Sequence, residues 1–183
     1  VPITNFYRNK TISKNSLPIK LTGYTPCFRR EAGSYGSDVR GLNRLHQFDK
    51  VEIVRIEEPS KSYEVLDEMV EHVKNLLLEL ELPFRIVRLC GGDLGFTSAL
   101  TYDFEVYSMG QNKWLEVSSV SNFESFQSNR LNLKIDLGDK KKNYAHTLNG
   151  SSLALPRIVA CILENFQEKD HINIPEKLHK YTG

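Results

Sequence analysis

Alternation of apolar and polar residues in successive short segments is the feature of this sequence that most limits its fold. Such a period of two residues is typical of strands that bury one face of a sheet. The segments are 83–90 (PFRIVRLC), 100–107 (LTYDFEVY), 113–120 (KWLEVSSV) and 131–137 (LNLKIDL). Gly138 and Asp139 then form a turn into NYAHTL, which predicts a hairpin over 131–148.

Two further segments have a helical period instead. Apolar residues recur at helical spacing over 60–82, and Pro83 ends the pattern. A second helix is predicted over 156–167, where Pro156 suits the first turn. Successive hairpins with few helices predict an α+β fold, in which an antiparallel β-sheet is flanked by helices, rather than a parallel nucleotide-binding sheet.

Composition narrows the classes of partner and compartment. The 183 residues contain no repeat or linker and indicate one compact unit; 24 Lys and Arg against 23 Asp and Glu give a net charge of +1, so any nucleic-acid contact must be local. Cys27, Cys90 and Cys161 lack disulfide or zinc spacing, which favours a reducing cytosol and a cytoplasmic protein. No apolar run approaches the roughly 18 residues of a membrane span. The opening VPITNFYRNK lacks methionine and is strand-like, as expected of an excised fragment.

Several short motifs do not indicate a catalytic or phosphate-binding function. CGGDLG (90–95) matches neither common phosphate-loop pattern and precedes a strand, so it predicts a turn. GSSLA lacks the spacing of a nucleophile elbow. The five histidines are scattered singly, and we therefore expect solvated or core roles for them.

Residues 28–52 (FRREAGSYGSDVRGLNRLHQFDKVE) place charges on both sides of a glycine-rich turn. With a strand period, Arg29 and Glu31 share one face before the turn. After it, one face is shared by His46, Phe48, Lys50 and Glu52. If the strands pair, a guanidinium, a ring and two carboxylates lie on one platform, which suits phosphate oxygens, a base and an amino group. From the pattern alone, an exposed hairpin with cross-strand ion pairs is the commoner structure.

The same stretch resembles motif 2 of class II aminoacyl-tRNA synthetases, in the form found in the seryl-tRNA synthetases. TLNGSSLALPRIVACILENFQ (147–167) resembles motif 3, and YDFEVY, WLEVSSVSNFESFQSNR and INIPEKLHKYTG resemble other segments of that family in the same order. The resemblance covers essentially the whole chain. It implies the class II catalytic core, with motif 2 at about 26–56 and motif 3 at about 147–167.

The resemblance also implies an ATP site. Arg29 matches the motif 2 arginine that holds the α-phosphate, Glu31 the acid at the adenine amino group, and Phe48 the ring that stacks on adenine. Arg157 matches the motif 3 arginine at the terminal phosphate, so Arg29 and Arg157 are the implied catalytic residues. The implied ATP-binding set is Arg29, Arg30, Glu31, Leu45, His46, Gln47, Phe48, Glu116, Val117, Ser118, Ser119 and Arg157.

A cation is implied beside this ATP site. Glu116 and Ser119 match residues that also hold a divalent ion, taken to be Mg²⁺. Strict alternation would pair Glu116 with Ser118 instead, so this site requires an irregularity in the strand. The simpler alternatives are a solvated strand charge for Glu116 and a surface cap at the start of the last helix for Arg157.

Substrate and reaction follow from the same resemblance. Glu52, Asn149 and Ser151 match contacts to substrate serine. The implied activity is that of a serine–tRNA ligase: ATP activates L-serine to seryl-adenylate, and the seryl group passes to the 3′ end of tRNA(Ser), with tRNA(Sec) as a further substrate.

The part of the family that precedes these motifs has no counterpart in this sequence. Family members carry a helical tRNA-binding arm, motif 1 and a Thr-x-Glu element before the matched residues. We therefore expect 1–183 to be a C-terminal part of a catalytic domain, inactive when isolated, and the intact protein to be a homodimer. Two other functions remain open: a synthetase-like ligase that loads an amino acid onto a carrier protein, and a non-catalytic nucleotide-binding fragment.

Overall fold

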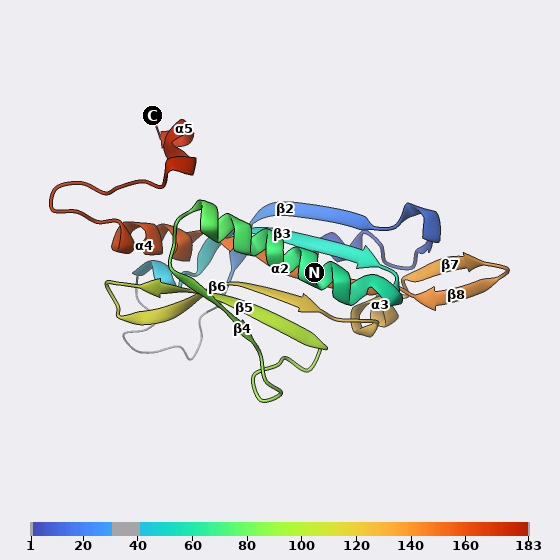
Figure 1. The fold of residues 1–183 in the computed structure, drawn as a ribbon. Helices are drawn as coiled ribbons and strands as arrows, with labels where there is room; N and C mark the ends of the chain where they lie inside the picture. Colours follow the sequence, from blue (N-terminus) through green and yellow to red (C-terminus); the bar gives the residue numbers. More distant parts are fainter. Residues whose placement is uncertain (1, 31–40, 183) are drawn as a thin grey trace.

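The structure is a computed structural model that describes residues 2–30 and 41–182. Two sheets organise these residues (Figure 1). The larger sheet has six strands in the order β2-β3-β9-β6-β5-β4, and each neighbouring pair is antiparallel. The smaller sheet has the order β1-β7-β8. The strands are β1 (Thr11–Ser13), β2 (Ile19–Phe28), β3 (Gln47–Glu57), β4 (Phe84–Arg88), β5 (Leu100–Ser108), β6 (Lys113–Asn122), β7 (Lys134–Gly138), β8 (Lys141–Tyr144) and β9 (His146–Ala154).

Helices pack against one face of the larger sheet. The α-helices are α1 (Pro2–Asn5), α2 (Ser62–Glu79), α3 (Phe126–Leu131), α4 (Leu155–Asn165) and α5 (His179–Thr182). Short 3-10 turns occur at η1 (Lys14–Ser16), η3 (Gly41–Asn43), η4 (Pro59–Lys61) and η5 (Glu176–Leu178). Figure 1 shows α2 lying across the strands, with α4 near one end of the sheet.

The main core lies between α2, α4 and the sheet. Leu66, Val73 and Leu77 of α2 are fully buried and belong to one cluster with Phe104 and Val120 of the strands. Because the apolar stripe of α2 occupies one side of the sheet, polar side chains of the same strands project from the opposite side. That opposite side carries the candidate site.

The predicted α+β architecture is confirmed, and the expected helices and most expected strands form. The helix expected over 60–82 is α2, preceded by η4, and that expected over 156–167 is α4. The CGGDLG segment forms turns, with the amide of Leu94 donating to the carbonyl of Cys90 at 2.9 Å.

Three local expectations are wrong. The chain opens with helix α1 rather than a strand, and Leu131 ends helix α3 rather than starting a strand, because Asn132 adopts a left-handed conformation (φ 52°) that terminates the helix. The predicted hairpin over 131–148 ends at Tyr144, since His146 already pairs with Glu57 in the larger sheet. Parallel pairing of β1 with β7 was also unforeseen, because β1 is only three residues long.

Candidate active site

The strand pairing expected on either side of residues 31–40 is present, and residues that follow β2 or belong to β3 line one pocket. Strands β2 and β3 pair so that Cys27 faces Phe48, and the amide of Arg29 donates to the carbonyl of His46 at 2.8 Å. The pocket has a volume of about 320 Å³, within the range of small-molecule sites. It is lined by Arg29, Leu42, Asn43, Leu45, Phe48, Lys50, Glu52, Glu116, Val117, Ser118, Ser119, Ser121, Phe123, Asn149, Ser151, Ala154, Pro156 and Arg157.

One end of the pocket is cationic. The guanidinium of Arg29 lies over the ring of Phe48, 4.6 Å from its centroid. Arg157 lies in the first turn of α4, after Pro156, and its Nε donates to the carbonyl of Asn43 at 3.1 Å while Nη1 donates to the carbonyl of Glu116. Burial and the nearby positive charge of Arg29 lower the pKa of Arg157. This repulsion between guanidinium groups is what a polyanionic ligand would relieve.

A β-bulge orients the wall of the pocket on β6. Phe104 of β5 faces Ser118 but Glu105 faces Glu116, so Val117 is an extra residue on β6. Val117 and Ser118 are both buried, whereas Glu116 and Ser119 are both more exposed. The bulge therefore resets the alternation and turns Glu116 and Ser119 toward the same side. The cation site implied by the family resemblance requires such an irregularity.

Acidic groups gather beside that bulge. Asp103 faces Ser119 across the strands, and one of its carboxylate oxygens is buried without a hydrogen-bond partner. Burial and the charge of Asp103 raise the pKa of Glu116, and burial raises the pKa of Asp103. The residue Glu116 as a whole is exposed. Its carboxylate nevertheless loses part of its hydration, because Glu116 also lines the pocket and is partly surrounded by protein there. A cation here would stabilise both ionised forms.

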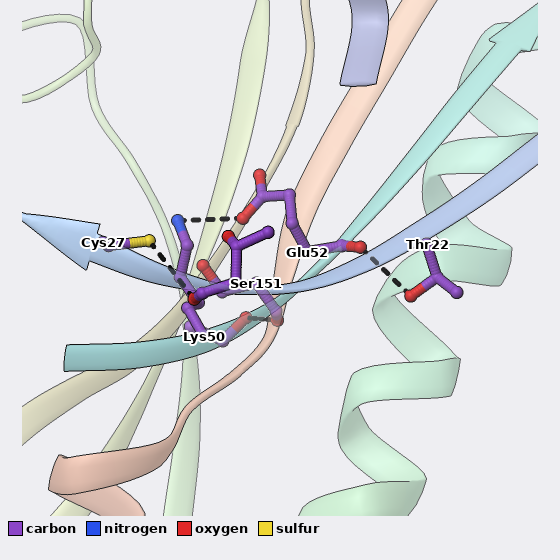
Figure 2. A network of polar contacts seen from close by, with 7 residues as sticks. Thr22, Cys27, Lys50, Glu52 and Ser151 are labelled. Atoms are coloured by element: carbon purple, nitrogen blue, oxygen red, sulfur yellow. Dashed lines mark hydrogen bonds and ion pairs between the residues drawn. The ribbon is translucent and has the colours of Figure 1, made fainter. Parts of the chain in front are cut away.

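The other end of the pocket is built from the middle of paired strands. Glu52 of β3 is flanked by Gly23 of β2 and Ser151 of β9. Its Oε2 lies 2.8 Å from Nζ of Lys50 (Figure 2). Both side chains are about one quarter exposed. The contact is an ion pair but not a directed hydrogen bond, because the same Oε2 has no hydrogen-bond partner. Glu52 therefore enters the pocket as one member of an ion pair with Lys50, which also lines it.

Neighbouring hydroxyl and amide groups complete this end. The amide of Asn149 lies 3.5 Å from Oε1 of Gln127, which also accepts from the hydroxyl of Thr147 at 2.8 Å. Gly150 lets β9 approach β6, because a Cβ there would meet Cγ2 of Val120 at 2.8 Å. The result is a small polar recess.

The structure brings most of the expected site residues together. Eleven of them line the pocket: Arg29, Leu45, Phe48, Glu52, Glu116, Val117, Ser118, Ser119, Asn149, Ser151 and Arg157. Arg30, His46 and Gln47 do not line it, although Nδ1 of His46 lies 3.3 Å from the carbonyl of Arg29. Glu31 lies outside the described residues.

Sequence reasoning missed several residues of the lining. Alternation placed Lys50 on the same face as Phe48 and Glu52, but no role in the site was assigned to it. Asn43 carries no periodic signal, because it lies in the short turn η3. The other unassigned lining residues are Leu42, Ser121, Phe123, Ala154 and Pro156.

Two features are absent from the described residues. Within 2–30 and 41–182, no three His, Cys, Asp or Glu side chains gather closely enough to hold a metal ion on their own. None of the helices in these same ranges has both the length and the apolar character needed to cross a bilayer.

Comparison with known proteins gives consistent matches. Residues 1–166 match the tRNA synthetase class II core domain (G, H, P, S and T). The chain is 56% identical over 185 residues to a serine–tRNA ligase of Salinibacter ruber, and 52% identical over 184 residues to one of Finegoldia magna. These alignments cover 100% of this chain but 43% and 44% of the relatives, so the chain spans less than half their length.

Solved structures agree with the sequence matches. The seryl-tRNA synthetase of Pyrococcus horikoshii complexed with ATP superposes with a TM-score of 0.95 and 42% identity, over 100% of this chain and 41% of that one. The cytoplasmic serine–tRNA ligase of Naegleria fowleri in complex with AMP gives a TM-score of 0.93 and 34% identity, over 98% and 43% of the two chains.

Proposed function

Because this chain belongs to the family of class II tRNA synthetase core domains, we propose that its pocket binds ATP and L-serine and takes part in serine–tRNA ligation. One observation carries the proposal: a single cavity joins the Arg29–Phe48 pair, Arg157 and Glu52. The relatives named serine–tRNA ligase match this chain over its whole length, which supports serine as the amino acid.

The cationic end suits the nucleotide. The ring of Phe48 offers an apolar face for adenine, and the guanidinium of Arg29 beside it suits the α-phosphate. Arg157 in the first turn of α4 adds its charge to the positive end of the helix dipole, a suitable place for the terminal phosphate. We assign contacts to the nucleotide to Leu45 and Phe48 and extend them to Arg30, Glu31, His46 and Gln47 only by family resemblance.

The polar end suits serine. Glu52 can accept from the α-ammonium group, and Asn149 and Ser151 offer hydrogen bonds for a small hydroxylated side chain. A site built to hydrogen-bond a hydroxyl discriminates against analogues that lack it, because its polar groups would be left unpaired.

The arrangement supports a reaction without a protein nucleophile. A carboxylate oxygen of serine attacks the α-phosphorus of ATP in line, the bond to the β-phosphate oxygen breaks, and pyrophosphate leaves. Arg29 offsets charge on the phosphoryl oxygens, and Arg157 holds the departing group. The 3′-terminal ribose hydroxyl of tRNA(Ser), and of tRNA(Sec), then attacks the seryl carbonyl and releases AMP.

The residues beside the bulge fit Mg²⁺. The ion usually takes one or two carboxylates and completes its shell with phosphate oxygens and water, so the absence of a three-ligand group in the described residues is compatible with it. Glu116 and Ser119 would hold it, and Asp103, which pairs with Ser119 across the strands, has one carboxylate oxygen without a hydrogen-bond partner. When bound, Mg²⁺ supplies positive charge to the phosphates.

Further properties of the intact protein complete the proposal. We propose that residues 1–183 form the C-terminal portion of a catalytic domain, with motif 2 at about 26–56 and motif 3 at about 147–167. The intact protein would be a cytoplasmic homodimer that recognises tRNA through segments outside this chain.

Exchange of labelled pyrophosphate into ATP tests the proposal. We expect serine to stimulate exchange by the protein at its full natural length, with little or none by the 183-residue chain alone. Serine-dependent AMP formation that loads a carrier protein and no tRNA would favour the alternative ligase. Nucleotide binding without any exchange by the full-length protein would favour the non-catalytic alternative.

A further inference from the structure

We propose that Gln111, which lies outside the pocket on the turn between β5 and β6, is a positioning residue for the nucleotide end of the site. Its side-chain amide links Glu164 of α4 to Asn43, and the carbonyl of Asn43 in turn fixes Arg157. The inference rests on the proposed function, since it assigns the effect to ATP binding.

The contacts form a continuous chain of hydrogen bonds. Nδ2 of Asn43 donates to Oε1 of Gln111 at 2.5 Å, and Nε2 of Gln111 donates back to Oδ1 of Asn43 at 3.2 Å. The same Nε2 lies 3.1 Å from Oε1 of Glu164. The two amides therefore pair reciprocally, and the carboxylate fixes the orientation of one of them.

At the end of this hydrogen-bond series that lies away from the pocket, Ser108 contacts both Glu164 and Gln111. Oγ of Ser108 donates to the second carboxylate oxygen of Glu164, and the backbone amide of Gln111 donates to that Oγ at 3.2 Å. Ser108 is fully buried. A Cβ at Gly110 would lie 3.1 Å from the carboxylate carbon of Glu164, so the turn and α4 are closely apposed.

The near end reaches the pocket. Asn43 lines it, and its carbonyl accepts from Nε of Arg157 at 3.1 Å. Arg157 also donates to the carbonyl of Glu116, so its guanidinium is held by η3 on one side and β6 on the other. Removing the amide of Gln111 would free η3 to shift, and one of the two fixed partners of Arg157 would shift with it.

Glutamine is the side chain that this position requires. It must accept from Asn43 and donate to Glu164 at the same time, which an amide can do and a carboxylate cannot. Gln111→Glu would retain the shape but place a second carboxylate against Glu164. Gln111→Ala would remove the link without introducing repulsion.

Steady-state exchange kinetics on the full-length protein test the inference. We expect Gln111→Ala to raise the KM for ATP about three- to tenfold, as loss of one or two hydrogen bonds implies, and Gln111→Glu to raise it further. The KM for serine should change less than about twofold, which is the usual limit for a surface substitution. The reason is that strand pairing holds Glu52 and Ser151 in place. Met109→Ala, on the same turn and 62% exposed, is the matched control.

A double-variant cycle separates a positioning role from a general loss of stability. If Gln111 acts through Asn43, Gln111→Ala combined with Asn43→Ala should raise the KM for ATP no more than Asn43→Ala alone. Additive effects, or equal rises in the KM for ATP and for serine, would overturn the inference. A wild-type protein without serine-dependent exchange would instead overturn the proposed function.

Discussion

The two ends of the pocket are built in different ways. At the proposed nucleotide end the side chains come from the ends of elements: Arg29 follows β2, Asn43 lies in a 3-10 turn, and Arg157 lies in the first turn of α4. At the proposed amino-acid end Glu52 and Ser151 face each other in paired strands, next to a register shift between Lys50 and Glu52. Backbone pairing of the strands holds this second end, whereas the first depends on individual side-chain hydrogen bonds, so the two ends should respond differently to substitution.

The largest effect is expected at Arg29. Arg29→Ala should lower serine-dependent ATP–pyrophosphate exchange by about 100-fold or more, because it removes a positioned cation from a charge-developing centre. Arg8→Ala, an exposed arginine remote from the pocket lining, is the control and should leave exchange unchanged. Normal exchange by Arg29→Ala would contradict the assignment of this end of the pocket to the nucleotide.

The second largest effect is expected at Glu52 and should be confined to the amino acid. Glu52→Gln keeps the shape of the side chain but removes the negative charge that faces the ammonium group of serine. The expected loss of binding free energy is about 2–3 kcal/mol, which corresponds to a rise of about 30- to 150-fold in the KM for serine. The KM for ATP should stay within about twofold of wild type. A parallel rise in both constants would show that the two ends do not act separately.

A moderate effect on stability is expected at Gly150. Gly150→Ala places a methyl group 2.8 Å from Val120 and 3.1 Å from the carbonyl of Ser119, which should cost about 1–3 kcal/mol as strands β6 and β9 move apart. Urea unfolding measures this loss. Gly95→Ala, where a Cβ meets nothing within 4 Å, is the matched control, and equal stability of the two variants would contradict the close approach at Gly150.

The smallest effect concerns pH and lies away from both ends. Burial lowers the pKa of His146, whose Nδ1 lies 2.8 Å from the hydroxyl of Ser62. The unfolded chain therefore binds a proton more readily than the folded one. The contribution of neutral His146 to the free energy of unfolding is fully present above the ordinary histidine pKa of 6.5 and is lost as the pH falls below that value. Urea midpoints measured between about pH 7 and pH 5 should decline less in His146→Asn; an unchanged decline would exclude His146 as its source.

The difference between the ends also explains what the sequence could reveal. Alternation predicted that Phe48 and Glu52 share a face, and β3 pairs with β2 over these residues without a register shift. It could not place Val117 as the extra residue of a bulge, because a bulge depends on the partner strand. Asn43 and Gln111 were equally out of reach, since their pairing joins residues 68 positions apart through side chains alone.

A crystal structure of the full-length protein with a non-hydrolysable seryl-adenylate analogue tests the division of the pocket most directly. We predict adenine against the ring of Phe48, the phosphate analogue at Arg29 and the ammonium group at Glu52. An analogue bound outside this cavity, or with its ammonium group directed toward Arg157, would contradict the account.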